Sequence, residues 1–383
     1  MSKPLDYRQL DHLKSRFLAG DLDRRSFLGL VGIAGLAAGV TGGPLRAMAQ
    51  AGVKEIKFHA WGGVAQEAMR KTGIAQFEKA TQIKIVEGTF GLEEEILTQA
   101  RAGRPGDFHV VNSAGIAWYK RWTDAGFGVV LNENNIPNLK HVMAAAIDPF
   151  RKVTPNGLSA IPYSYGNTGI AYNKKYISPE RASAEREMLM IDPKLKGKLS
   201  GHNDFQTRIW AAALQTKQDP NNIKDMDAIW AKVRESRSLV KKYWGSGAES
   251  TELLASEEVY ASDIWSGRAA ALMARNSDIG YVDYSKGYCW GSDLLVLKGA
   301  PVEACEQFLN FLLDPQVLIA VAEAQLYPPT LDPTKVALPD AVKALPNFDP
   351  TGTLSKFAVS DPDYWTKNEK SWKPMYSRIE KGF

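Results

Sequence analysis

Residues 56–113, IKFHAWGGVAQEAMRKTGIAQFEKATQIKIVEGTFGLEEEILTQARAGRPGDFHVVNS, alternate between strand-like and helix-like patterns. The predicted strands cover residues 56–61, 83–86 and 108–111, and the predicted helices cover residues 64–80 and 93–102. A strand–helix alternation is typical of an α/β fold with a largely parallel sheet. In such sheets ligands bind beyond the carboxyl ends of the strands, where Trp61 and Ser113 lie.

A second α/β region follows residues 161–173, IPYSYGNTGIAYN, which are extended, punctuated by glycine and rich in tyrosine. We predict that this segment crosses from a first lobe to a second. The expected later elements are helices at 207–214 and 227–243, a short strand at 270–274, a strand at 293–297 that crosses back, and helices at 302–313, 317–325 and 376–381. The expected division places 53–172 with 294–340 in lobe 1, and 173–293 with 341–383 in lobe 2.

The composition indicates an ordinary globular protein. Hydrophobic residues make up 44% of the chain and charged residues 23%, so gross disorder is not expected. The net charge of +4 is small for 383 residues, and the basic residues are scattered. Because nucleic-acid binding requires a concentrated basic surface, we expect no nucleic-acid partner.

The first fifty residues carry the marks of an export signal. Arg24 and Arg25 precede an uncharged apolar run at 27–40, and Ala47-Met48-Ala49 follows as a peptidase site. A membrane anchor is the alternative, but a span needs roughly 20 apolar residues. We predict a twin-arginine signal at 1–49, read by the twin-arginine export machinery and then cleaved, and a soluble mature protein in the periplasm. Because this route carries folded proteins, a bound cofactor has to be considered.

Neither the cysteines nor the histidines form a metal-binding pattern. Cys289 and Cys305 either stay as two buried thiols or form one disulfide, and the spacing does not decide between them. The histidines are His12, His59, His109, His141 and His202, without an H-x-x-x-H pair. We therefore expect no metal site and no cofactor.

The order of several motifs resembles the spermidine/putrescine-binding proteins, a family of periplasmic solute receptors of ABC importers. The motifs are the strand that ends at Trp61, GNTGIAYN at 166–173, DPKLKGK at 192–198, WSGR at 265–268, WGSD at 290–293 leading to LVLKGAP at 295–301, and FLNFLLDP at 308–315 with Tyr327-Pro328 after it. The resemblance implies two α/β lobes with the ligand between them, and a monomeric binding protein, not an enzyme. It also implies a permease in the inner membrane as partner.

The resemblance assigns ligand-binding roles in the first lobe and the crossing segment. Trp61 matches a tryptophan that lines the family site, and its alternative is core packing. Gly62 stands where relatives often carry a hydroxyl. Ser113 matches a site serine, although a serine there also caps helices. Tyr165 is expected to point into the cleft, and Gly115 replaces a common aromatic residue, which leaves that wall to another part of the chain.

Further roles fall in the second lobe and the late helices. Asp204 matches a family carboxylate and could equally be a helix N-cap. Trp265 matches a site tryptophan, Trp290 lies near another, and Tyr327 matches a late aromatic residue. Asp293 matches the acid that binds an amine group throughout the polyamine binders, the alternative being a surface ion pair.

Arg268 is the most informative departure from the family pattern. Some putrescine binders carry an aspartate at the position of Arg268, where it binds the second ammonium of the ligand. A second acidic residue of the family is replaced in this chain by Thr207. A guanidinium repels an ammonium but pairs with a carboxylate in bidentate fashion. The sequence therefore favours a zwitterionic ligand, such as an ω-amino acid or an amino-acid derivative, over a diamine. The alternative is that Arg268 turns outward and pairs with a surface acid.

Two other functions have to be weighed. An exported cofactor enzyme would carry a nucleotide loop, a metal cluster or a nucleophile elbow, and the sequence contains none of these motifs. An iron-binding member of the same superfamily would use paired tyrosines, and no Tyr-Tyr pair occurs. The solute receptor is thus the expected function.

Overall fold

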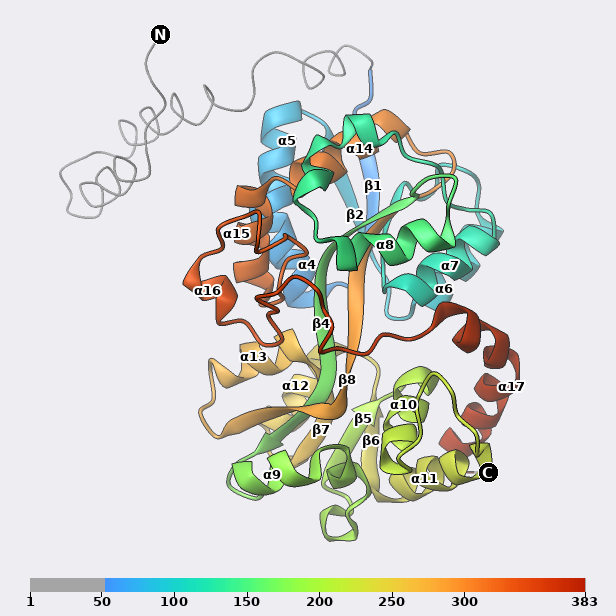
Figure 1. Cartoon of the computed structure of the whole chain (residues 1–383), viewed down its shortest axis with the longest axis vertical. Coiled ribbons are helices and arrows are strands. Elements are labelled where there is room, and N and C mark those ends of the chain that lie inside the picture. Colours follow the sequence, from blue (N-terminus) through green and yellow to red (C-terminus); the bar gives the residue numbers. More distant parts are fainter. Residues whose placement is uncertain (1–51, 383) are drawn as a thin grey trace, which may run out of the picture. The chain divides into compact units, whose positions relative to one another are not determined.

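The computed structural model describes residues 52–382, so the predicted export signal at 1–49 lies outside the described residues. Residues Lys54–Phe383 form one compact unit. Its strands make an eight-stranded sheet in the order β2-β1-β3-β8-β4-β7-β5-β6 (Figure 1). We call β1–β3 with their helices the first lobe, and β5–β7 with their helices the second lobe.

The first lobe confirms the predicted strand–helix alternation. Strands β1 (Glu55–Ala60), β2 (Lys84–Thr89) and β3 (Val110–Ser113) are parallel neighbours. Alternate residues of β1, including Ile56 and Phe58, are fully buried. The predicted helix at 64–80 is α4 (Gly63–Met69) and α5 (Ala75–Thr81) joined by a π-helical segment, and the next helices are α6 (Glu93–Ala102), α7 (Ile116–Asp124) and α8 (Ala144–Val153).

Two long strands connect the lobes. β4 (Ala160–Asn173) contains the predicted extended segment, and β8 (Ile279–Val296) runs antiparallel to it along its whole length. In Figure 1 they run side by side from the region of β1 to the region of β7. The sheet is therefore continuous across the molecule. The exact residues at which the two lobes divide stay a prediction.

The second lobe corrects two predictions. Of residues 270–274, predicted as a strand, 270–273 belong to helix α13 (Ser266–Met273) and Ala274 is its C-cap, because the alanine-rich run has a high helix propensity. The helix predicted at 227–243 is α11 (Met226–Leu239), and the residues after it form strand β6 (Val240–Trp244). The remaining elements of this lobe are β5 (Leu199–His202), β7 (Ala261–Trp265), α9 (Pro179–Glu185), α10 (Phe205–Gln215) and α12 (Gly247–Ala255).

The C-terminal part returns to both lobes. Its helices are α14 (Val302–Leu312), α15 (Pro315–Gln325), α16 (Asp340–Lys343) and α17 (Pro362–Glu380). The helix predicted at 376–381 is thus much longer, since Asp361 caps it at Tyr364 N and Pro362 begins it. Helix α17 packs against α7 of the first lobe and against α10 and α11 of the second.

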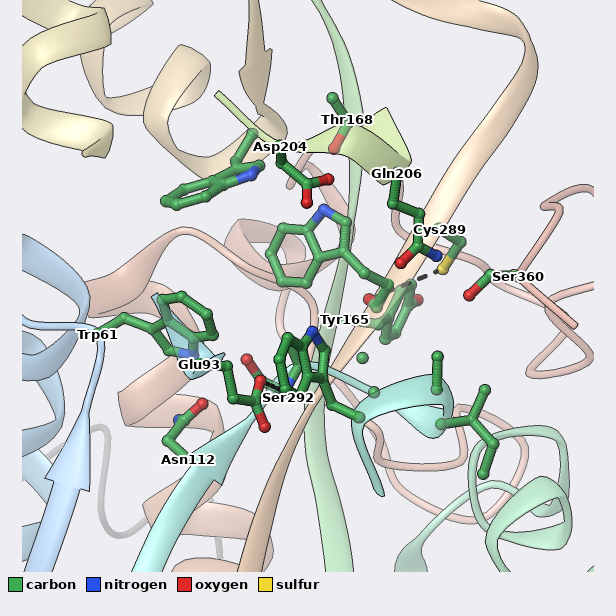
Figure 2. A pocket seen from close by; sticks show the side chains of 18 of the residues that line it. Trp61, Glu93, Asn112, Tyr165, Thr168, Asp204, Gln206, Cys289, Ser292 and Ser360 are labelled. Carbon is green, nitrogen blue, oxygen red and sulfur yellow. Dashed lines mark hydrogen bonds between the residues drawn. The ribbon is translucent and has the colours of Figure 1, made fainter. Parts of the chain in front are cut away.

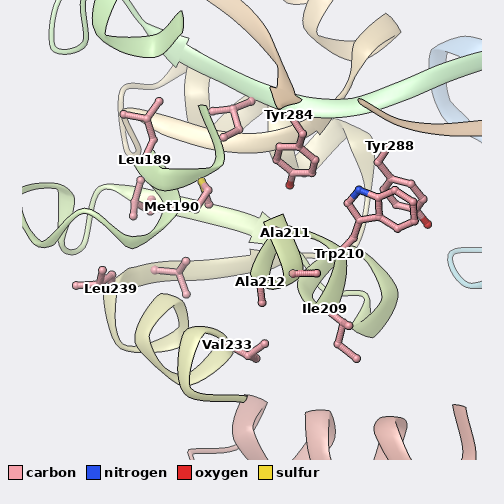
Figure 3. Close-up of a cluster of buried hydrophobic side chains, with 14 of the residues drawn as sticks. Leu189, Met190, Ile209, Trp210, Ala211, Ala212, Val233, Leu239, Tyr284 and Tyr288 are labelled. Carbon is pink, nitrogen blue, oxygen red and sulfur yellow. The ribbon is translucent and has the colours of Figure 1, made fainter. Parts of the chain in front are cut away.

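The core of the second lobe forms around Trp210. Its indole stacks on Tyr288 at 4.4 Å between ring centroids and lies 6.1 Å from Trp365 (Figure 3). Both cysteines are buried free thiols, so the thiol alternative holds in this structure. Among residues 52–382, no helix combines the length and apolarity that crossing a membrane requires.

Candidate functional site

A cavity of about 540 Å³ lies between the two lobes. Helix ends and strand ends of the first lobe, the middle of β4 and β8, and the start of α10 and α13 contribute its lining. Of the predicted site residues, the lining includes Trp61, Gly62, Tyr165, Asp204, Trp265, Arg268, Trp290 and Tyr327. Figure 2 shows Trp61, Glu93 and Asn112 on one side, with Thr168, Asp204 and Gln206 opposite them.

Aromatic rings from both lobes meet in this cavity. The Trp61 and Trp265 centroids lie 6.5 Å apart, edge to face, although the two residues belong to different lobes. Trp290 lies 6.5 Å from Trp265 and 5.2 Å from Tyr327. In an edge-to-face pair the ring that offers its edge keeps its own π faces uncovered by that partner, and such faces attract cations. The predicted aromatic walls are therefore brought together.

Asp204 is both a cavity residue and a helix cap. Its Oδ2 accepts hydrogen bonds from Thr207 N at 2.8 Å and from Thr207 Oγ1 at 2.9 Å, which caps α10. No hydrogen bond from residues 52–382 reaches its Oδ1. The sequence left open whether this residue caps a helix or faces the cleft, and the structure shows both.

His202, close to Asp204, is a neutral ring in the cavity wall. Its imidazole stacks on Trp244 at 4.3 Å, and burial lowers its pKa to about 4. Its backbone N–H donates to Asp263 Oδ1 at 2.6 Å, and the other oxygen of Asp263 pairs with the Arg208 guanidinium. This buried ion pair joins α10 to β7, and so fixes the elements that carry Asp204 and Trp265.

Ser113 and Asp293 lie behind the cavity wall and are absent from its lining. Both are fully buried, and they are paired in register between β3 and β8. Asp293 Oδ1 accepts from Gly115 N at 2.8 Å, while its Oδ2 is buried without a partner. Burial raises the pKa of Asp293 to about 7. The sequence correctly predicted that these two residues lie near the cavity. They lie behind its lining and support it, and they do not face the solute.

Glu93 is a buried acid that does line this side of the cavity, next to Glu94. Ser113 Oγ and Trp122 Nε1 donate to its Oε1, and Ala114 N donates to its Oε2 at 2.8 Å. Burial, and secondarily the charge of Asp293, raise its pKa to about 8. Glu93 begins α6 shortly after the end of β2, so the rule that ligands bind beyond strand ends could have identified it.

Two glycines explain departures from the family pattern. Gly62 has φ 68°, a left-handed conformation that disfavours a residue with a hydroxyl side chain. Gly115 has φ 79°, and a Cβ there would lie 3.2 Å from Gly291 N. An aromatic side chain does not fit at 115, and Trp118, in the next turn of the same segment, lines the cavity instead.

Residues 73–350 match the family model for bacterial extracellular solute-binding proteins. The chain belongs to this family. It is 24% identical over 327 residues to the putrescine-binding periplasmic protein SpuD of Pseudomonas aeruginosa, which covers 81% of this chain and 88% of that protein. It is 25% identical over 332 residues to the putrescine-binding periplasmic protein PotF of Escherichia coli, covering 79% and 87%.

Solved structures confirm the predicted fold. The spermidine/putrescine substrate-binding protein PotD of Streptococcus pneumoniae superposes with a TM-score of 0.67 at 18% identity, covering 85% of this chain and 99% of that one. An α/β periplasmic-binding fold is thereby shown. The family's extracellular description and its periplasmic members also confirm that this solute-binding protein works outside the cytoplasm, in the periplasm.

Proposed function

We propose that this protein is the receptor of an ABC importer and captures a small solute that carries an ammonium group. The observation that carries the proposal is the position of Asp204 in a cavity walled by Trp61, Trp265 and Trp290. Aromatic faces and a carboxylate together favour an organic cation over neutral solutes. The putrescine-binding relatives support the same class of solute.

Capture requires movement of the two lobes. The cavity is lined from both lobes, and β4 and β8 connect them across the sheet. A solute that contacts Trp61 on one lobe and Asp204 on the other therefore favours the closed arrangement by its own binding energy. We propose that the closed monomer is what an inner-membrane permease recognises, and that the protein has no enzymatic activity.

We also propose that residues 1–49 are a cleaved twin-arginine signal. The support is the order of the arginine pair, the apolar run and the small-x-small site in the sequence. Replacing Arg24 and Arg25 by lysine should retain the protein in the cytoplasm in its longer form. Normal export of that double variant would contradict the twin-arginine route.

The central experiment is a binding screen on the purified protein. Putrescine, spermidine and γ-aminobutyrate are tested by calorimetry and by thermal shift, because a ligand of the folded state raises the melting temperature. At least one amine should bind, and Trp61→Ala and Trp265→Ala should each weaken it tenfold or more. Tyr176→Ala serves as an aromatic control, since Tyr176 is exposed and absent from the cavity lining. If no small amine binds, the proposed function is wrong.

A further inference from the structure

We infer that the cavity contains a subsite for a carboxylate group, built on Arg268, so that the solute carries both an ammonium and a carboxylate. This inference rests on the proposed function, because it describes the other end of the same solute. Three features of the cavity support it: an unpaired guanidinium, the helix end beside it, and buried donors that lack acceptors.

The first feature is the Arg268 side chain itself. It lines the cavity, and its Nε is buried without a hydrogen-bond partner. Across residues 52–382, no carboxylate forms an ion pair with this guanidinium. The alternative weighed from the sequence, an outward turn to a surface acid, does not occur in this structure. A partly buried guanidinium without a counter-charge is costly unless an anion accompanies it.

The second feature is the backbone around the guanidinium. A Cβ on Gly247, the first residue of α12, would lie 2.7 Å from Arg268 Nε and 3.2 Å from Cδ. A Cβ on Gly63 of the first lobe would lie 3.6 Å from Nη2. The stem therefore lies against the start of α12 and the guanidinium reaches the opposite lobe. Because a helix N-terminus carries partial positive charge, it adds to the attraction for an anion here.

The third feature is a pair of further donors without acceptors. Trp290 Nε1 and Gln325 Nε2 are buried, line the cavity and have no hydrogen-bond partner. Buried donors normally find an acceptor, so this cavity is completed by a group that only accepts. The Tyr327 ring packs between Trp290 and Gly267, and thereby brings Trp290 to the part of the cavity where Arg268 lies.

The acceptors lie elsewhere in the same cavity. Asp204 presents Oδ1, the oxygen that does not cap α10. Asn112 Oδ1 is buried without a partner, while Asn112 Nδ2 donates to Tyr163 Oη at 2.6 Å. The site thus contains acceptors for an ammonium and donors for a carboxylate. A diamine would satisfy the acceptors but would place its second ammonium beside Arg268. The chemistry fits an ω-amino acid or a related zwitterion.

The test compares ligands of equal chain length. For chains of four, five and six carbons, the affinities of the ω-amino acid, the α,ω-diamine and the n-alkylamine are measured by calorimetry. At the best length the amino acid should bind at least tenfold tighter than the alkylamine, and the diamine no tighter than the alkylamine. Arg268→Gln should abolish the advantage of the amino acid over the alkylamine of the same length.

A second variant guards against a general defect at Arg268. Gly247→Ala retains every charge but forces the guanidinium away from its position, so it should weaken the amino acid several-fold and spare the alkylamine. Diamines that bind more tightly than matched amino acids, with no loss of amino-acid affinity in Arg268→Gln, would overturn the carboxylate subsite and leave the amine receptor intact. Failure of all three ligand types would overturn the receptor proposal itself.

Discussion

Asp204 shows how one side chain serves local structure and the cavity together. It caps α10 through Oδ2 and faces the cavity between the lobes. Asparagine is as good an N-cap as aspartate, so Asp204→Asn keeps the helix and removes only the charge. We expect amine affinity to fall tenfold to a hundredfold, since a hydrogen bond to a charged group contributes about 1.5–3 kcal/mol. Calorimetry gives the affinity, and thermal unfolding should change little.

A matched control exists at the next helix. Asp225 caps α11 by accepting from Ala228 N at 3.0 Å, and it does not line the cavity. Asp225→Asn makes the same chemical change at the same structural position. It should leave both affinity and stability as they are. An equal loss of affinity in both variants would refute a direct role for Asp204.

Asp293 should make the stability of the unliganded protein depend on pH. Burial raises the pKa of Asp293 to about 7 and that of Glu93 to about 8, above the values of an unfolded chain. The folded state therefore favours protonated carboxyls. Their stabilising contribution is full below the unfolded pKa values of about 4, falls as the pH rises from there, and is lost once the pH passes 7–8. The described histidines act in the opposite direction, because burial lowers the pKa of each and stability then rises with pH up to the unfolded value of about 6.5.

The variant Asp293→Asn isolates this effect. The asparagine oxygen still accepts from Gly115 N, and the amide nitrogen replaces an oxygen that has no partner. Relative to Asp293→Asn, the melting temperature of the parent protein should fall as the pH rises from about 4 to 7, and the difference should level off above that range. Parallel curves for the two proteins would show that this carboxyl does not titrate in the expected range.

The sequence predicted which residues lie near the cavity better than it predicted which of their side chains face it. Eight of the ten predicted site residues line the cavity, because strand ends and the family motifs locate them along the chain. Ser113 and Asp293 do not, since no motif encodes the turn that follows β3. In that turn Ala114 and Gly115 donate their N–H groups to Glu93 and Asp293 and enclose both acids. Such pairing depends on contacts between β3, α6 and β8 that are distant in sequence.

The ion pair between α10 and β7 is an element-scale feature that no pattern predicted. Asp263 is fully buried and Arg208 nearly so, and Asp263 also accepts from His202 N. Removing one partner of a buried pair leaves an unpaired charge and costs about 3–5 kcal/mol. Asp263→Ala should therefore lower the free energy of unfolding by that amount, as measured by urea denaturation.

An exposed ion pair serves as the control for the buried pair of Arg208 and Asp263. Lys343 and Asp340 pair at 3.4 Å on the short helix α16, where both side chains are exposed. Because exposed pairs contribute about 0–1 kcal/mol, Asp340→Ala should change stability little. Similar losses in the two variants would mean that burial does not set the strength of the α10–β7 pair.

The burial patterns of the helices and strands explain which of them were predicted correctly and which were not. Alternating patterns identified β1–β3 and their helices. β1 has one regular buried face and β3 is fully buried. Residues 240–244 of β6 and the first half of β8 were missed, because exposed and partly buried residues such as Lys241, Lys242 and Lys286 interrupt their patterns. Helix α17 extends far beyond its prediction because contacts with both lobes, more than its own polar sequence, stabilise it.

At the scale of the whole molecule, helix α17 joins the lobes by a chain of charges. Arg121 of α7 lies 4.3 Å from the Trp118 ring and pairs with Glu369 of α17, and Glu369 also pairs with Lys373. Lys373 donates to Glu94 of the first lobe at 2.8 Å. On the other side, Tyr376 Oη donates to Asn203 Oδ1 at 2.9 Å in the second lobe. A movement of the lobes that takes α17 away from the first lobe would therefore separate charges that are paired in this structure.

Glu369→Gln tests whether these contacts set the equilibrium between open and closed lobes. Glu369 and Arg121 are both mostly shielded from solvent, so loss of the carboxylate leaves a guanidinium unpaired only when the lobes are closed. Under the proposed closure on solute binding, the apparent affinity for the solute should fall several-fold, and small-angle scattering should show a larger radius of gyration without solute. Asp363→Asn on the same helix is the control, because Asp363 is largely exposed and its pair with Lys120 is long, at 3.6 Å. A loss of affinity without any change in scattering would place the effect of Glu369 at the solute and not at closure.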